Sequence, residues 1–152
     1  MIFEGSAPLR AALSRVWDFL LDMQQVSACV PGIQDVVQID AETFDGTILA
    51  QVGPISGRFS FRAQIIERRP PSELTATISG TDSVTKSAVS GEVTVRLAAA
   101  GDEHTLLFYR STVNVKGRLA ILGEILLRAT GNLMLQETIE RMRKRLEERP
   151  AA

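Results

Sequence analysis

The segment that decides the fold reads LAILGEILLRATGNLMLQETIERMRKRLEE, residues 119–148, and predicts one long helix. Its first half, residues 119–135, is almost entirely apolar, and Glu124, Arg128 and Asn132 mark one narrow polar stripe at four-residue spacing. The second half keeps a single apolar row whose alternating steps of four and three fit one helix face: Leu135, Ile139, Met142 and Leu146. Such a helix needs a large apolar surface to cover its first half.

Two interpretations of that first half stay open. Either it is buried in an ordinary core, or it lines a cavity. Gly123 and Gly131 each cost about 1 kcal/mol inside a helix relative to alanine. We therefore interpret these two glycines as points of close approach or slight bending.

Length and composition limit the function classes. The 152 residues fit one domain, which we place at residues 1–148, with a frayed tail at 149–152. A net charge of -1 is not the excess of positive charge that nucleic-acid-binding domains show. The single cysteine, Cys29, allows no internal disulfide. The sequence shows no signal peptide and no apolar run of membrane-spanning length. We therefore expect a cytoplasmic protein.

The rest of the chain predicts a sheet. Ile2–Leu9 reads as a strand, and two short helices follow at Ala11–Asp22, with Ser14 as a candidate N-cap, and Gln24–Cys29. Period-two patterns then recur between turn signals at Ile33–Ile39, Thr43–Val52, Gly57–Glu67, Glu73–Gly80, Ser87–Ala98 and Thr105–Lys116. The expected fold is α+β, a seven-stranded antiparallel sheet wrapped around the long C-terminal helix.

Pairing across the turns gives an internal test of this sheet. Counting back from Gly53-Pro54 places Ile48 opposite Phe61, and counting back from Gly101 places Val93 opposite Tyr109. The same counting places Glu92 beside Arg110 on the other face. The apolar members keep one parity across three hairpins, so they are expected to share the concave face that holds the helix.

Few residues are suited to catalysis. His104 is the only histidine and lies in an acidic turn, so we interpret it as solvated. Cys29 lies among apolar residues at a helix end and reads as a buried, inert thiol. Histidine or cysteine clusters for a metal site are absent from the sequence. We therefore predict no catalytic residue and no metal ligand.

Several local motifs in a fixed order then point to a family. They are Val30-Pro-Gly after the second helix, Val52-Gly-Pro-Ile-Ser and Arg69-Pro-Pro after two strands, Gly91-Glu-Val-Thr-Val-Arg-Leu, and Gly117-Arg-Leu-Ala-Ile-Leu-Gly before the last helix. With the order of elements, they resemble the CoxG family, which is named for carbon monoxide dehydrogenase. This family belongs to the SRPBCC, or Bet v 1-like and START-related, superfamily with the helix-grip fold.

The resemblance implies a function. Family members accompany molybdenum hydroxylases of the carbon monoxide dehydrogenase type and are linked to maturation, membrane recruitment or quinone handling. It implies a non-catalytic accessory protein with no covalent cofactor and with a quinone or another lipophile as the candidate ligand. Some members carry a C-terminal membrane-binding segment. This sequence shows none, so peripheral membrane contact is left open without an anchor in this chain.

The expected ligand site combines the concave face with the apolar half of the helix. The cavity residues would be Trp17, Leu21, Phe44, Ile48, Phe59, Phe61, Ile78, Val93, Tyr109, Leu122, Ile125, Leu126, Ala129 and Leu133. The entrance would lie at Gly53, Pro54, Gly80, Thr81 and Gly117. Two alternatives remain: an enzyme of the same fold, such as an aromatase/cyclase or a hydrolase, and a pure protein-interaction module.

Overall fold

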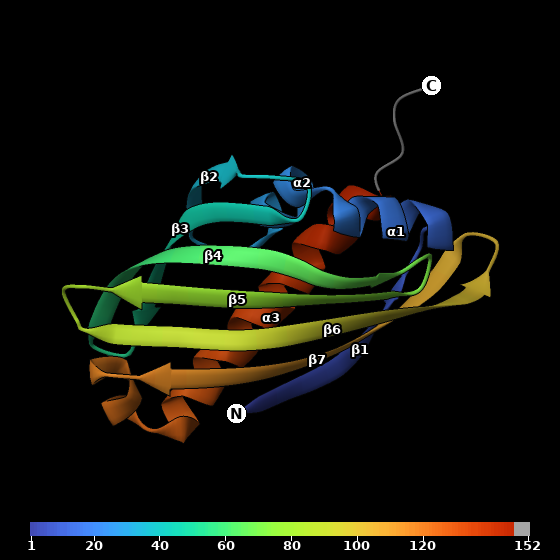
Figure 1. Cartoon of the computed structure of the whole chain (residues 1–152). Helices are drawn as coiled ribbons and strands as arrows, with labels where there is room; N and C mark the ends of the chain where they lie inside the picture. Colours follow the sequence, from blue (N-terminus) through green and yellow to red (C-terminus); the bar gives the residue numbers. More distant parts are fainter. Residues whose placement is uncertain (148–152) are drawn as a thin grey trace.

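The computed structural model describes residues 1–147, which form one sheet with helices on one of its faces (Figure 1). The predicted tail at 149–152 lies outside these residues. In chain order the elements are β1 (Ile2–Leu9), α1 (Leu13–Leu21), α2 (Met23–Cys29), β2 (Ile33–Gln38), β3 (Thr43–Val52), β4 (Ile55–Arg69), β5 (Glu73–Asp82), β6 (Ser87–Gly101), β7 (His104–Lys116), the 3-10 helix η1 (Arg118–Leu122) and α3 (Glu124–Glu147). The predicted order of elements is confirmed.

The sheet is antiparallel throughout, and its seven strands lie in the order β1-β7-β6-β5-β4-β3-β2 among the described residues. Every strand from β2 to β7 therefore pairs with its neighbour in sequence, while β1 closes the far edge against β7. Figure 1 shows α3 crossing the sheet diagonally, with α1 and α2 at the end where α3 finishes. The predicted α+β helix-grip architecture is thus confirmed.

The two short helices begin differently. Ala12 precedes α1 and has no side chain that could cap it, so the predicted N-cap at Ser14 is wrong. Asp22 caps α2, because its carboxylate accepts the backbone N–H of Gln25 at 3.3 Å and the side-chain amide of Gln25 at 2.9 Å. The hydrogen bond from the Gln25 side chain is the main reason that the pKa of Asp22 is lowered.

The last helical segment is not one helix. Gly123 separates η1 from α3 with φ 87° and ψ 158°, a backbone conformation that only glycine adopts readily. Gly131, in contrast, stays inside α3 and allows close approach, since a Cβ there would lie 2.6 Å from the ring of Phe3. The glycine interpretation was therefore right at Gly131, while Gly123 is a full break. No helix of the described residues is long and apolar enough to cross a membrane.

The predicted hairpin registers are wrong by two residues, but the predicted faces are right. Ile48 pairs with Phe59 instead of Phe61, and Val93 pairs with Ser111 instead of Tyr109. Because side chains alternate with a period of two, an even shift leaves each residue on its own face. The expected Glu92–Arg110 pair is also lost, and Arg110 instead lies 4.0 Å from Glu4 of β1.

Two separate hydrophobic clusters join α3 to the sheet. The larger cluster packs Met142 and Leu146, at the end of α3, against Trp17 of α1 and against inward residues of β4 to β7. The smaller cluster packs Val52, Phe59 and Leu119, with Leu122, Leu126 and Leu127 around them. The helix is therefore held at both ends by different sets of side chains.

A small polar network fixes the β5–β6 loop to η1. The buried Asp82 carboxylate accepts the backbone N–H groups of Val84 at 2.9 Å and Arg58 at 3.2 Å, and the Thr85 hydroxyl at 3.0 Å. The Ser87 hydroxyl accepts the backbone N–H of Leu119 at 3.0 Å. The hydrogen bond from Val84 is the main cause that lowers the pKa of Asp82.

Replacement of Phe61 tests the packing of the concave face. Its ring is 5% exposed, meets Phe44 edge-on at 6.0 Å and lies against Gly46. Phe61→Ala is expected to lower the free energy of unfolding by about 3–5 kcal/mol. Ile66→Ala is the control, because Ile66 is 53% exposed. This substitution should lower the free energy of unfolding by about 0.5 kcal/mol or less. Denaturant melts measure both, and equal losses would contradict the assigned core.

Asp82→Asn tests the loop network through pH. The folded-state pKa of Asp82 lies below 3.8, so the stabilisation by its carboxylate is present above that pH and is lost as the pH falls through the lowered pKa. The wild type should therefore lose stability more steeply below pH 3.8 than Asp82→Asn does. Melts along a pH series measure this, with Asp102→Asn in the exposed β6–β7 turn as the control for losing one charge. Parallel profiles for wild type and Asp82→Asn would contradict the network.

Candidate functional site

The middle of the concave face is not fully covered by α3. Ile78 points inward from β5, on the same face as buried Leu74 and Gly80, yet 44% of its surface is exposed. It belongs to neither hydrophobic cluster. An inward-facing isoleucine with this exposure means that α3 does not cover the sheet between the two clusters. The concave face thus keeps uncovered apolar surface there, and the neighbouring half-buried Val93 and Val113 extend it across β6 and β7; we call this uncovered surface the hollow.

A groove of about 260 Å³ lies between α3 and the end of β3. Its apolar lining comes from Pro31, Leu49, Ala50, Leu133 and Met134, and its polar lining comes from Gln51, Thr130 and Glu137. Gly32 lets the turn before β2 approach β3 closely, because a Cβ there would lie 2.2 Å from the carbonyl oxygen of Leu49. The groove therefore combines an apolar wall with a few polar groups, which is typical of small-molecule sites.

The structure divides eleven of the fourteen predicted cavity residues among three places in the interior. Trp17, Leu21, Phe44 and Tyr109 pack in the larger cluster, and Ile48, Phe59, Leu122 and Leu126 pack in the smaller one. Phe61, Ile78 and Val93 lie between the clusters on the concave face. Of the predicted set, Ile78 and Val93 border the hollow, whereas the Phe61 ring is 5% exposed and packs toward Gly46 and Phe44; most of the others are plain core.

Three predicted residues on the helix do not face the sheet. Ile125 is 90% exposed, Leu133 is 67% exposed, and Ala129 is exposed between them, so the spacing of four puts all three on the outward face of α3. The prediction that they line an internal cavity is wrong for Ile125 and Ala129. Leu133 instead borders the groove beside β3. The inward face carries Leu127, Gly131, Met134 and Leu135.

The predicted entrance is filled by side chains. Leu126 closes on the Gly53 turn, where a Cβ on the glycine would lie 2.8 Å from the Leu126 side chain. Gly117 packs against the backbone of Lys86, because a Cβ on this glycine would lie 1.9 Å from the Lys86 carbonyl oxygen. Pro54 belongs to the same closed turn, and Gly80 is buried beside Phe61. The end of the sheet that was predicted to be the entrance is therefore closed by the side chains of the smaller cluster.

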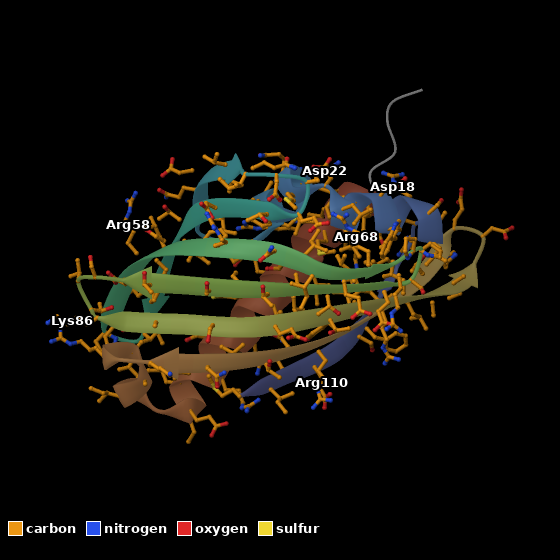
Figure 2. The ribbon with its side chains drawn as sticks, in the orientation of Figure 1. Asp18, Asp22, Arg58, Arg68, Lys86 and Arg110 are labelled. Atoms are coloured by element: carbon orange, nitrogen blue, oxygen red, sulfur yellow. The ribbon has the colours of Figure 1, made fainter. Side chains whose placement is uncertain are left out.

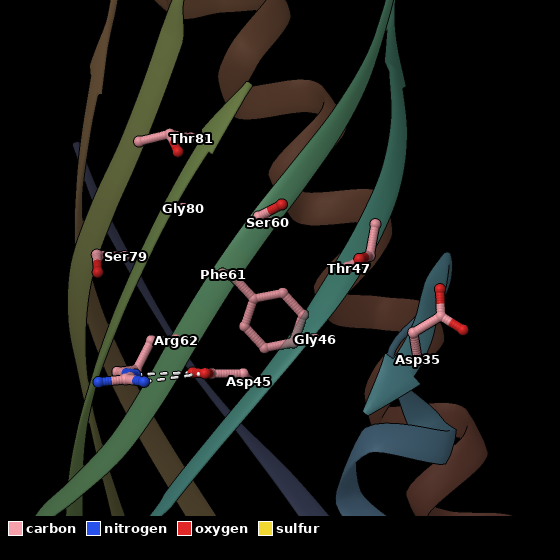
Figure 3. A pocket seen from close by; sticks show the side chains of 10 residues that line it. All are labelled: Asp35, Asp45, Gly46, Thr47, Ser60, Phe61, Arg62, Ser79, Gly80 and Thr81. Atoms are coloured by element: carbon pink, nitrogen blue, oxygen red, sulfur yellow. Dashed lines mark hydrogen bonds and ion pairs between the residues drawn. The ribbon is translucent and has the colours of Figure 1, made fainter. Parts of the chain in front are cut away.

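A larger depression, of about 510 Å³, lies on the convex face of β3, β4 and β5 (Figure 3). Thr81 belongs to it, together with the hydroxyls of Thr47, Ser60 and Ser79. Within it the Arg62 guanidinium donates two hydrogen bonds to the Asp45 carboxylate, at 2.7 and 2.9 Å. The Arg62 hydrogen bond is the main cause that lowers the pKa of Asp45. This surface is open and polar, and we assign no ligand to it.

The titratable groups singled out from the sequence are placed as follows. Cys29 is fully buried, and this burial raises the pKa of its thiol, although Arg145 and Arg141 oppose the rise through charge. The two arginines lie far from Cys29 in the sequence, so no local pattern indicated them. His104 is exposed at the start of β7. Within residues 1–147, no group of three or more histidine, cysteine or acidic side chains could hold a metal ion.

The groove residues were missed from the sequence. Pro31 and Gly32 were recognised only as part of the Val30-Pro-Gly motif after the second helix, and Ala50, Thr130 and Met134 were not singled out as site residues. Of the groove residues, only the turn signal at Pro31-Gly32 could have indicated a site, because a tight turn can lie close to a helix. The other positions depend on how α3 is rotated, which the apolar pattern leaves open.

Solved structures define the class of fold. A conserved protein from Geobacillus kaustophilus is 20% identical, with a TM-score of 0.88, over 96% of this chain and 95% of that one. A START superfamily protein from Mycobacterium smegmatis is 12% identical, with a TM-score of 0.74, over 96% of this chain and 97% of that one. The Zhui aromatase/cyclase from Streptomyces sp. R1128 is 14% identical, with a TM-score of 0.67, over 100% and 96% of the two chains. The fold is therefore START-like.

The family follows from the sequence. The model of the carbon monoxide dehydrogenase CoxG family matches residues 5–147, almost the whole described chain. This chain belongs to the CoxG family. A comparison with curated proteins gave no match.

Overpacking tests whether the concave middle is open. Ile78→Phe adds volume where Ile78 is 44% exposed, so we expect a change in the free energy of unfolding below about 1 kcal/mol. Leu97→Phe is the matched control, because Leu97 points inward from β6 but is 6% exposed within the larger cluster. Leu97→Phe should lower the free energy of unfolding by about 1–3 kcal/mol. If both substitutions cost the same in denaturant melts, the hollow at Ile78 is filled in solution.

Proposed function

We propose that this protein is a non-catalytic accessory protein that binds a hydrophobic small molecule between α3 and the concave face. The observation that carries the proposal is the inward-facing but 44% exposed side chain of Ile78. A lipophile that covers this aliphatic side chain removes apolar surface from water, which is favourable by roughly 25 cal/mol per Å². A ligand that fills the space between the two clusters would therefore complete the core.

The lining determines the chemistry of this ligand. Ile78 and Val93 present apolar surface, and the half-buried Ser111 and Thr130 add hydroxyl groups. A mostly apolar molecule with a few oxygen atoms suits these walls, and a quinone or another lipid-like compound has that character. We place its entrance at the groove beside β3, because Leu133 and Met134 give the groove an apolar rim next to the helix.

The partner is an enzyme of the carbon monoxide dehydrogenase type. This part of the proposal is supported by membership of the CoxG family, whose name is that of a component of this enzyme. A lipophile carrier beside a molybdenum hydroxylase would serve it in maturation, in recruitment, or in handling its electron acceptor. Of these roles, electron-acceptor handling fits a quinone-sized apolar site most directly, because a quinone can take up electrons.

A ligand-blocking variant tests the binding site. Ile78→Trp should fill the hollow, leave the fold intact and weaken the binding of a quinone analogue at least about tenfold, measured by fluorescence titration. Ile66→Trp adds the same ring on the convex face and should bind like wild type. Native mass spectrometry of the purified full chain should show a retained lipophile in the wild type and less of it in Ile78→Trp. Equal affinities for folded Ile78→Trp and wild type would place the ligand elsewhere.

The enzyme partnership needs a separate experiment. Co-purification with a carbon monoxide dehydrogenase-type enzyme, followed by activity with a quinone acceptor, should depend on wild-type protein and fall with Ile78→Trp. A stable enzyme complex formed equally by a ligand-free, blocked variant, with unchanged activity, would instead identify a pure interaction module. Turnover of an aromatic polyketide substrate by the chain alone would identify an enzyme and contradict the accessory role.

A further inference from the structure

Two hydroxyl groups on the inward side of β7 have no hydrogen-bond partner among residues 1–147. The inward side chains of this strand include Thr105, Tyr109 and Ser111, since residues two apart in a strand share a face. The Thr105 hydroxyl donates to the backbone carbonyl oxygen of Ala11 at 2.8 Å. The hydroxyls of Tyr109 and Ser111 have no such bond within the described chain. The packing of the fold therefore uses one of these three hydroxyls and leaves two.

Both unpartnered hydroxyls are accessible from the interior. Among the described residues, no buried side-chain oxygen lacks a hydrogen-bond partner. Tyr109 and Ser111 are half-buried, so their unpartnered oxygens must reach open space. Ser111 pairs across the sheet with Val93 of β6, which borders the hollow, and Tyr109 pairs with Val95. The two oxygens are therefore available on the β7 side of the hollow.

The position of the Tyr109 ring is set by a glycine of the edge strand. Gly5 of β1 lies directly opposite Tyr109, and a Cβ on Gly5 would lie 2.6 Å from the tyrosine hydroxyl oxygen. Covering a glycine with an aromatic ring is a device that stabilises edge strands. A phenylalanine would cover Gly5 equally well. This packing therefore accounts for the ring of Tyr109 but not for its hydroxyl group.

The other polar side chains around the hollow are already engaged. In α3, Thr130 and Thr138 each donate to a backbone carbonyl oxygen one turn earlier, at 3.0 and 2.7 Å. Arg110, between the two β7 residues in the sequence, alternates to the convex face and lies 4.0 Å from Glu4. Figure 2 labels Arg110 at the edge formed by β7 and β1, with α3 behind the sheet. The two β7 hydroxyls are therefore uncharged donors that remain free.

We propose that the Tyr109 and Ser111 hydroxyls donate hydrogen bonds to carbonyl oxygens on the ring of the bound lipophile. This inference rests on the proposed function, because it assigns the polar contacts of the same site. A carbonyl oxygen that enters an apolar site without a partner costs free energy, whereas one that accepts from these hydroxyls regains the bond it made to water. The site therefore selects a ring with carbonyl groups over a hydrocarbon of the same shape.

The place of these hydroxyls in the sheet also orients the ligand. They lie on β7, whereas the groove that we assign as the entrance lies beside β3, on the other side of the hollow. The carbonyl-bearing ring would therefore lie toward β7. An apolar tail on the ring would pass Ile78 of β5 and leave the interior between Leu133 and the end of β3.

Two compounds with the same carbon skeleton test the inference. Menadione, a methylated naphthoquinone, carries ring carbonyl groups, and methylnaphthalene carries none. Tyr109→Phe keeps the ring over Gly5, so it should weaken menadione binding at least about fivefold, as expected for one lost hydrogen bond, and change methylnaphthalene binding by less than about twofold. Ser111→Ala should do the same. Ser79→Ala, which removes a hydroxyl from the convex face, should bind both compounds like wild type when affinities are measured by displacement of an apolar fluorescent dye from the full chain.

Infrared spectroscopy of bound menadione gives a readout that a merely structural role would not change. A hydrogen bond to a carbonyl oxygen weakens the C=O bond, so the stretching band should lie at lower frequency in wild type than in Tyr109→Phe. Equal menadione affinities and band positions in wild type, Tyr109→Phe and Ser111→Ala would overturn the inference and leave the proposed site intact, as would equal losses for both compounds. If neither compound binds wild type, or if Ile78→Trp binds both unchanged, the proposed function fails and this inference fails with it.

Discussion

The contact of a straight helix with a curved sheet is the constraint on which this structure depends. With 24 residues, α3 is about 36 Å long. The two clusters, around Leu146 at the end of α3 and around Leu119 of η1, lie at opposite ends of this helical segment, and the middle of α3 approaches the edge strand β1 at Gly131. Between them the inward side chain of Ile78 stays accessible. The hollow is therefore a consequence of how the helix is gripped.

The faces of the strands could be predicted from the sequence, while the pairing could not. Period-two alternation assigns Phe59 and Val93 to one face without any knowledge of turns. The register depends on turn length and bulges. The β3–β4 turn is only Gly53-Pro54, since Val52 pairs directly with Ile55, and bulges interrupt β4 and β6. Each of these features shifts the pairing by small steps that leave no apolar signature in the sequence.

The rotation of α3 about its own axis, which decides which residues face the sheet, could not be predicted from the sequence. Both sides of its first half are apolar, so the narrow stripe of Glu124 and Arg128 was the natural choice for the outward face. In the structure this stripe lies against β1 instead. Arg128 donates to the carbonyl oxygen of Ile2 at 2.8 Å, and its guanidinium lies 5.4 Å from the ring centre of Phe3. Local tertiary contacts with the edge strand thus overrode the pattern, and the truly outward row is Ile125, Ala129 and Leu133.

This rotation gives the first half of α3 three distinct faces. The charged stripe binds the edge strand, the side with Leu127 and Met134 faces the sheet, and the row with Ile125 faces solvent. Before the break at Gly123, η1 places Leu119 in the smaller cluster and leaves Ile121 exposed. Because Gly123 has φ 87° and ψ 158°, a conformation that only glycine adopts readily, the direction of η1 need not follow the axis of α3, and Leu119 closes the core at this end.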